Sequence, residues 1–235
     1  MRIVAINDID RQLDEKELES WIRLTRVLTH EIMNAITPVT SLSETLLQLH
    51  GDRDDDIRRG LEVIQTTSQG LISFVESYRR FTRIPCPEFQ LVYVKKMLER
   101  LVLLASEPIR NREVRIDVEV DQDDLIIQAD ENQISQVILN LLKNALAAIG
   151  ERPGGRIRIK AYCDRNEQVN IEVSNNGEPI PPEVAEQIFV PFFTTRPDGS
   201  GIGLSISRQI MRLHHGSIKL LYSNEQETVF ALVFR

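Results

Sequence analysis

Apolar or small side chains recur at alternating steps of three and four residues through the first third of the chain. They begin at Leu18 and continue to Leu49. After a turn at Gly51 the same spacing resumes at Ile57 and continues to Thr82. This is the heptad pattern of helices that pack along a seam. It predicts two long helices joined by a short turn, which form an antiparallel hairpin.

The two apolar stripes of such a hairpin are wider than the hairpin alone can cover. Two interpretations stay open: a second copy covers them in a dimeric four-helix bundle, or the rest of the same chain packs on them. The segment Ile84-Pro85-Cys86-Pro87 ends the second helix, because proline lacks a backbone donor and disfavours helical geometry in the residue before it. We therefore expect an N-terminal segment over 1–17, the helical hairpin over 18–84 and a second domain over 85–235.

Beyond this boundary the pattern alternates between strand-like and helix-like stretches. It predicts helices on one face of a mixed sheet, an α+β sandwich. We expect strands at 89–94, 114–120, 156–162, 170–174, 218–222 and 228–234, and helices at 95–107, 131–149 and 200–213.

Composition narrows the class of protein. Hydrophobic residues make up 42% and charged residues 27% of 235 residues, as in an ordinary globular protein. A net charge of -7 argues against a nucleic-acid backbone as partner. Cys86 and Cys163 suggest neither a disulfide framework nor a zinc site. Without a long apolar run or a signal peptide, this segment is expected to be cytoplasmic and to make no membrane contact, although a full-length parent can be membrane-anchored.

His30 is the first candidate for chemistry. The heptad frame set by Leu28 and Ile32 turns its side chain outward, with Glu31 beside it and Asn34 one turn away. A neutral imidazole with a pKa of about 6.5 is a nucleophile near neutral pH, and a carboxylate can fix its tautomer. An idle surface histidine is the rival interpretation. Pro38, which interrupts the pattern, indicates either a functional bend or a tolerated kink.

Four later segments carry a second candidate site. Asn140 and Asn144 lie one turn apart on a helix and offer oxygens to Mg²⁺ and donors to phosphate. The other segments are 175–180, a turn after a strand; 189–195, rich in Phe and Thr; and 199–204, glycine-rich and opening a helix. Glycines at a helix start let backbone N–H groups approach an anion. Each segment alone is weak evidence for a binding site, and the order of all four along the chain strengthens the assignment.

The segment Val27-Leu28-Thr29-His30-Glu31-Ile32-Met33-Asn34 followed by Pro38 resembles the phosphoacceptor box of sensor histidine kinases of two-component systems, of the NtrB/NtrY-like kind. The helical hairpin is similar to their dimerisation and histidine-phosphotransfer domain. The resemblance implies a homodimer through the hairpin and phosphorylation of His30. It also implies that Asn34 positions a water when the kinase runs in reverse as a phosphatase.

The four later segments resemble the N, G1, F and G2 boxes of the histidine-kinase ATP-binding domain, a fold shared more distantly with Hsp90-type ATPases. The resemblance implies ATP and Mg²⁺, an ATP lid from about Thr194 to Gly203, and a response-regulator receiver domain as partner. It implies nucleotide contacts from Asn140, Lys143, Asn144, Asn175, Gly177, Ile180, Thr194, Thr195, Arg196, Gly199, Ser200, Gly201, Gly203 and Leu204, with Asn144 and Asn140 as magnesium ligands. For Arg196 a solvated surface arginine is the open alternative.

The sequence departs from the family pattern at two positions. Asn175 stands where the family has an aspartate that accepts from the adenine amino group, and Pro179 replaces a glycine. A neutral acceptor is weaker than a charged one, so adenine affinity is in question. Residues 2–9 resemble the last strand of a PAS sensor domain.

The favoured function is an ATP-dependent protein-histidine kinase that passes phosphate to a regulator aspartate. A general ATPase of the wider superfamily is the first alternative, although such enzymes place a glutamate where this chain has Asn140. A degenerate dimeric scaffold or phosphatase-dominant partner with weak nucleotide binding is the second.

Overall fold

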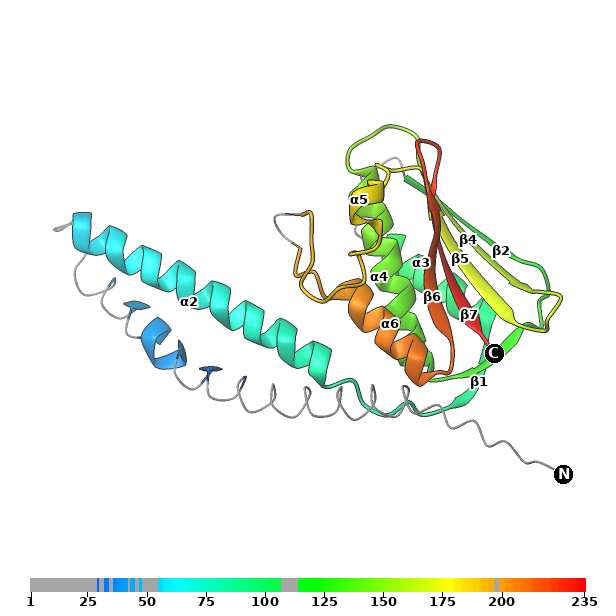
Figure 1. The fold of residues 1–235 in the computed structure, drawn as a ribbon, viewed down its shortest axis with the longest axis horizontal. Coiled ribbons are helices and arrows are strands. Elements are labelled where there is room, and N and C mark those ends of the chain that lie inside the picture. The colour runs from blue at the N-terminus through cyan, green and yellow to red at the C-terminus, as the bar shows by residue number, and fades with distance from the viewer. Residues whose placement is uncertain are drawn as a thin grey trace, which may run out of the picture. The chain divides into compact units, whose positions relative to one another are not determined.

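A computed structural model describes Thr29, residues 32–33, 36–41, 43–44 and 47, and the ranges 55–106, 114–196 and 199–235. The chain divides into two units, residues 1–83 and 84–235. Figure 1 shows a long helix in the first unit and a sheet with its covering helices in the second. None of the helices in these ranges is both long and apolar enough to cross a bilayer.

Helix α2 (Asp55–Thr82) dominates the described part of the first unit. Leu61, Ser68 and Val75, seven residues apart, are buried. The intervening seam positions are open, with Ile64 43% and Leu71 38% exposed. The second predicted helix is therefore confirmed. The described residues from Thr29 to position 47 are helical, while the turn at Gly51 and the segment 2–9 lie outside the described residues.

The main sheet of the second unit has five strands in the order β2-β4-β5-β7-β6. Strands β2 and β4 pair in parallel, whereas the other neighbours are antiparallel, so the sheet is mixed as predicted. The strands are β2 (Val114–Val120), β4 (Gly155–Cys163), β5 (Val169–Asn175), β6 (Ser217–Ser223) and β7 (Thr228–Phe234).

Two short elements were not predicted. Strand β3 (Ile126–Ala129) pairs antiparallel with β1 (Gln90–Tyr93) in a separate two-stranded sheet. Helix α5 (Pro182–Ala185) follows the turn after β5. Each covers only four residues, too few for a periodic pattern to show.

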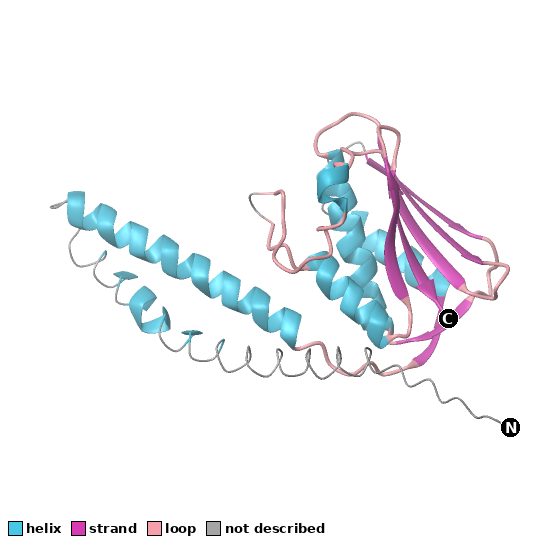
Figure 2. Cartoon of the chain, viewed as in Figure 1, coloured by secondary structure: helices cyan, strands magenta, loops and turns pink. Residues whose placement is uncertain are grey.

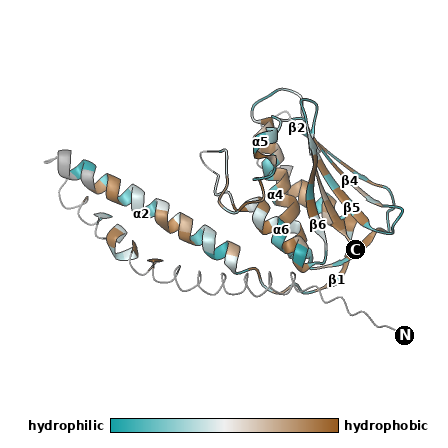
Figure 3. Cartoon of the chain, viewed as in Figure 1, coloured by the Kyte–Doolittle hydropathy of each residue, from teal (hydrophilic) through white to brown (hydrophobic). Residues whose placement is uncertain are grey.

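Helices cover one face of the main sheet (Figure 2). They are α3 (Val94–Ser106), α4 (Glu131–Ile149) and α6 (Gly203–Leu213). Hydrophobic residues follow α4 and the strands that it covers (Figure 3), and Ile138 and Leu142 of α4 are fully buried, as are Ile159 and Ile171 of the sheet. This layer of apolar contact holds the sandwich together. The predicted α+β sandwich is confirmed.

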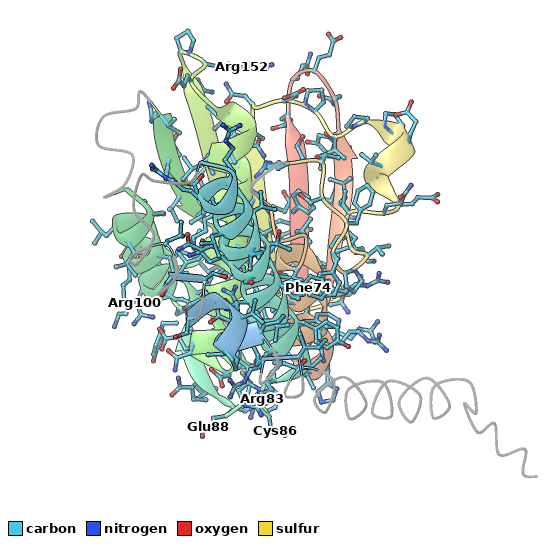
Figure 4. All side chains as sticks on the ribbon, turned by 90° about the vertical axis from the view of Figure 1, so that its left-hand side faces the viewer. Phe74, Arg83, Cys86, Glu88, Arg100 and Arg152 are labelled. Carbon is cyan, nitrogen blue, oxygen red and sulfur yellow. The ribbon has the colours of Figure 1, made fainter. Side chains whose placement is uncertain are left out.

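The long axis of α4 fixes the two ends of this unit. Cys86 and Glu88 lie at one end, and Arg152, just after α4, lies at the other (Figure 4). Arg100 on α3 is bonded to Glu131 in the first turn of α4, with Nη2 and Oε1 2.7 Å apart. Helix α4 therefore spans the unit from its N-terminal segment to the far turns.

Candidate nucleotide-binding site

Helix α4 is the platform of the site. Asp130 caps its start, because the Asp130 Oδ1 accepts from the backbone N–H of Asn132 and of Gln133 at 3.0 and 3.1 Å. The helix ends at Gly150, whose φ of 61° is easily reached only without a side chain. Between these ends, Asn140 and Asn144 lie on one face and are half-buried. Their amides border the apolar layer.

Asn140 joins α4 to the start of α6. Its Nδ2 donates to Ser207 Oγ at 3.1 Å, and Ser207 Oγ donates to the backbone oxygen of Gly203 at 3.0 Å. A Cβ on Gly203 would overlap the Asn140 amide oxygen. A side chain at this position would displace the Asn140 amide, so glycine keeps the first turn of α6 against Asn140. The asparagine helix and the glycine-rich segment, separate in sequence, meet here.

The segment between β5 and α6 also contacts α4 at Asn144. Arg196 Nη2 donates to the backbone oxygen of Asn144 at 3.0 Å. Thr194 Oγ1 accepts from the Arg196 backbone N–H at 3.1 Å, and Gly199 N–H donates to the Arg196 oxygen at 3.2 Å. The Arg196 side chain is exposed but bonded, so it is not merely solvated. A cationic side chain is thus bonded to the backbone of α4 at Asn144.

The base of this segment is closed by Phe192 and Gly201. The Phe192 N–H donates to the Gly201 oxygen at 2.9 Å. Gly201 has a φ of 67°, and a Cβ there would lie 2.5 Å from the Phe192 backbone. Both the positive φ and the overlap with the Phe192 backbone therefore exclude a side chain at Gly201. The pairing of Phe192 with Gly201 therefore holds together the two ends of the segment between them.

The turn after β5 packs on the far end of α4. Buried Asn175 accepts the Gly177 N–H through Oδ1 at 3.0 Å. A Cβ on Gly177 would lie 2.5 Å from the backbone of Ala148 and 2.6 Å from that of Ile149. Glu178 N–H also donates to the Ala148 oxygen at 2.9 Å. The turn is therefore held one helical turn beyond Asn144.

Two polar residues beside this turn were not predicted from the sequence. Thr228 is buried and is the register partner of Asn175 across β5 and β7. Its Oγ1 lies 2.6 Å from Ser223 Oγ, which accepts the Ile180 N–H at 2.8 Å. Serine and threonine in a strand carry no motif, so only the sheet register could reveal them. They add hydroxyl groups to the Asn175 end of the site.

The remaining residues that the sequence predicted for the site differ in their exposure. Lys143 and Ser200 are exposed near the amide pair and the glycine-rich segment, as is Thr195, whereas Leu204 is half-buried in the first turn of α6. No group of three or more His, Cys, Asp or Glu side chains that could hold a metal occurs among the residues placed by the structure. His30, Glu31 and Asn34 lie outside the described residues.

Comparison with known proteins agrees with this geometry. The model of the family described as histidine kinase-, DNA gyrase B-, and HSP90-like ATPase matches residues 129–235. A protein of Rickettsia felis named as an NtrY-like sensor histidine kinase is 28% identical over 98% of this chain. The match covers 40% of the Rickettsia protein, so the chain spans well under half the length of that relative.

Solved structures extend the likeness to both units. The catalytic domain of the histidine kinase ThkA is 36% identical and superposes with a TM-score of 0.56, over 63% of this chain and 95% of that one. ThkA in complex with the response regulator TrrA covers 99% of this chain and 68% of that one, at 28% identity and a TM-score of 0.64. The chain belongs to the sensor histidine kinase family.

Proposed function

We propose that the chain is the catalytic core of a sensor histidine kinase, which transfers the γ-phosphate of ATP to His30. The observation that carries the proposal is the meeting of three separate segments at Asn140 and Asn144. Gly203 and Ser207 approach Asn140, and Arg196 approaches Asn144. Phosphoryl transfer depends mostly on positioning and charge stabilisation, which such a convergence supplies.

The amide pair suits Mg²⁺ held jointly with nucleotide phosphates. Mg²⁺ is usually bound through one or two protein oxygens, with phosphates and waters completing its shell. Asn144 and Asn140 each carry an amide oxygen, and the Asn140 Nδ2 is engaged by Ser207, which orients its amide. The ion would neutralise phosphate charge. Asn144 is the principal ligand in this proposal and Asn140 the second.

Phosphate would also be held by cations and by the start of α6. The exposed Lys143 and the lid residue Arg196 supply positive charge near the amide pair. Helix α6 has eleven residues, and its first N–H groups have no helical partner. Such groups favour an anion, aided by the helix dipole. We assign Gly199, Ser200, Gly201, Gly203 and Leu204 to this phosphate-binding role, with Thr194 and Thr195 in the lid.

His30 is the proposed acceptor on the basis of its sequence neighbours. Glu31 would hold one ring N–H, leaving the other nitrogen as the nucleophile, and would stabilise the positive charge that develops on the ring. Asn34 would position water in the reverse, phosphatase reaction. The product phosphate would pass to an aspartate of a response-regulator receiver domain. The ThkA complex with its regulator supports such a partner.

A homodimer through the helical hairpin is part of the proposal. Ile64 and Leu71 occupy seam positions on α2 yet are exposed, and neighbouring Phe74 is 47% exposed. A second copy that adds two more helices would bury these side chains in a four-helix bundle.

The test is phosphorylation of the full chain with ATP labelled in the γ-phosphate. We expect acid-labile, base-stable label that disappears in His30→Gln. Asn144→Ala should also lose label, through lost nucleotide binding, and a mixture of the two variants would regain it if the dimer phosphorylates in trans. Label that survives His30→Gln would refute the assignment of the acceptor.

A degenerate scaffold remains the alternative, and it rests on Asn175 and Pro179. Titration of the chain with ATP and Mg²⁺ separates the two functions. Binding in the micromolar to low millimolar range, typical of an enzyme substrate, supports the kinase. No heat of binding at millimolar nucleotide would support the scaffold.

A further inference from the structure

The chain between the β5 turn and α6 is shaped by a series of short backbone hydrogen bonds. The N–H groups of Val184, Gln187, Val190 and Phe193 each donate to the carbonyl oxygen three residues earlier, at distances from 2.8 to 3.2 Å. Such bonds join neighbours along the chain and do not tie the segment to the sheet or to the long helices. Helix α5, at the start of this series, has no buried side chain. The position of the segment therefore depends on side chains that reach beyond it.

Phe189 is one such side chain. Its half-buried ring meets the ring of buried Phe230 on β7 edge-on, with centroids 6.4 Å apart and planes at 82°. The guanidinium carbon of Arg208, on α6, lies over the Phe189 ring at 5.6 Å from its centroid. Edge-on ring pairs and cations placed over a ring are both attractive arrangements. Phe189 is thus held by a strand through one contact and by α6 through the other.

The Arg208 side chain is exposed, and the ring is the contact that the structure shows for its guanidinium. No carboxylate in the described part of the chain forms an ion pair with it. The backbone of α6 just before Arg208 is fixed, because Ser207 bonds both to Gly203 and to the Asn140 amide. Arg208 therefore extends from a fixed helix to a segment that has few fixed points of its own.

The segment that Phe189 holds also carries Arg196, seven residues further along the chain. Arg196 Nη2 donates to the Asn144 backbone oxygen at 3.0 Å, and the other N–H groups of its guanidinium can donate to a phosphate. The hydrogen bond from Phe193 to Val190 links the backbone next to Phe189 with the backbone that leads to Arg196. A shift of Phe189 away from α6 would therefore move Arg196 with respect to Asn144.

We propose that Arg208 is a positioning residue of the nucleotide site. From α6 it holds the Phe189 ring, and through that ring it keeps Arg196 at Asn144, where Arg196 can meet a nucleotide phosphate. Arg208 itself does not contact the nucleotide. The inference rests on the proposed function, because it takes phosphate binding by Arg196 as given.

The first test is calorimetric titration with Mg²⁺-ATP. It uses the full chain carrying His30→Gln, so that the nucleotide is not consumed. Arg208→Met keeps a long unbranched side chain but removes the cation. We expect the affinity to fall about two- to fivefold, the equivalent of an exposed cation–π contact. Arg208→Lys retains a cation for the ring and should recover part of the loss.

Arg212→Met is the matched control. Arg212 is exposed one turn further along α6, and it forms neither an ion pair nor a ring contact within the described residues. The substitution removes the same charge from the same helix and should leave the affinity for Mg²⁺-ATP unchanged. A loss in Arg212→Met equal to that in Arg208→Met would show that only the net charge of α6 matters, and would overturn the inference.

Double substitutions test whether Arg208 acts through Phe189 and Arg196. If it does, Arg208→Met should cause no further loss of affinity in a chain that already carries Phe189→Leu or Arg196→Ala. An Arg208 that acted by charge alone, or by stabilising α6, would weaken binding by the same factor in every background. Melting curves identify any variant that fails to fold, and Arg196→Ala changes an exposed side chain, so that cycle remains if Phe189→Leu does not fold.

The outcomes separate this inference from the proposed function. Unchanged affinity in Arg208→Met, or an undiminished loss in the Arg196→Ala background, would overturn the positioning role and leave the kinase intact. Absence of Mg²⁺-ATP binding by the chain carrying only His30→Gln would overturn the proposed function and this inference with it.

Discussion

The backbone N–H of Asp130 donates a 3.0 Å hydrogen bond to Nε2 of His214, which ties the start of α4 to the end of α6. Since Nε2 accepts, the ring proton sits on Nδ1 and is donated to the Ile210 backbone oxygen at 2.8 Å. The buried ring also meets Phe89 edge-on, with centroids 5.3 Å apart. The two helices of the candidate nucleotide site and the segment that follows the Pro85–Pro87 stretch therefore share one junction.

Replacing His214 should destabilise the second unit. His214→Phe keeps an aromatic ring but leaves the Asp130 N–H without its acceptor, which costs about 1–3 kcal/mol when a buried group is left unpaired. His214→Gln, which retains an amide oxygen, should recover part of that loss. Urea denaturation gives the unfolding free energies. Equal stabilities for His214→Phe and the unsubstituted chain would show that the hydrogen bond contributes nothing.

Asp130 offers a second test of the same junction. Its Oδ1 caps α4, while its Oδ2 accepts the Glu88 N–H at 3.1 Å. Asp130→Ala removes both roles and should cost about 0.5–2 kcal/mol for the lost cap alone. Asp130→Asn keeps a capping oxygen and should lose less. The measurement is again the unfolding free energy in urea. An unfolding free energy that is unchanged in Asp130→Ala would contradict the capping role.

The charge of Asp130 predicts a pH dependence. Partial burial raises the pKa of this carboxyl, but hydrogen bonds from the N–H groups of Glu88, Gln133 and Asn132 outweigh burial and leave the pKa below its ordinary 3.8. A carboxyl whose folded pKa is depressed stabilises the fold above its unfolded pKa, and this stability is lost as pH falls through the folded value. The stability difference between the unsubstituted chain and Asp130→Asn should therefore be constant above about pH 5 and shrink below about pH 4. A stability difference that persists unchanged to pH 2 would refute the depressed pKa of Asp130.

Much of the second unit could be predicted because its signals are local. Helix α4 has the bounds expected from the sequence, since Asp130 and Gly150 mark its ends and apolar residues repeat between them. The strands β4 and β5 are long enough for alternation to show. By contrast, β3 exists through its pairing with β1, and no local pattern encodes that partner.

The site was harder to predict than the fold. Asn140 and Asn144 stood out because amides on an otherwise apolar helix face are conspicuous. Thr228 did not, because its place opposite Asn175 depends on strand register between segments more than fifty residues apart. The orientation of the Asn175 amide also depends on a folded contact, the Gly177 N–H, that sequence could not supply.

A glycine pair tests the close approach of the β5 turn to α4. Gly177→Ala places a Cβ against backbone atoms of Ala148 and Ile149, which cannot give way as a side chain can. We expect a loss of about 1–3 kcal/mol, the usual cost of overpacking, together with weaker nucleotide binding. Gly70→Ala on α2 is the control, because nothing lies within 4 Å of its added Cβ. It should raise stability by about 0.5–1 kcal/mol, as alanine does in a helix interior. Thermal unfolding of Gly177→Ala that matches the unsubstituted chain would show that the turn can move away.

Two serines of α6 separate helix stability from the positioning of Asn140. Ser205 and Ser207 each donate to a backbone oxygen of the preceding turn, at 2.8 and 3.0 Å, but only Ser207 also accepts from Asn140 Nδ2. Ser207→Ala frees the Asn140 amide to rotate, so it should weaken Mg²⁺-ATP binding about three- to tenfold, the equivalent of one hydrogen bond. Ser205→Ala makes the same change to the helix and should leave affinity within about twofold. Calorimetric titration of both variants decides: equal losses in the two would mean that α6 itself is disturbed, and only a loss confined to Ser207→Ala makes Ser207 a positioning residue of the site.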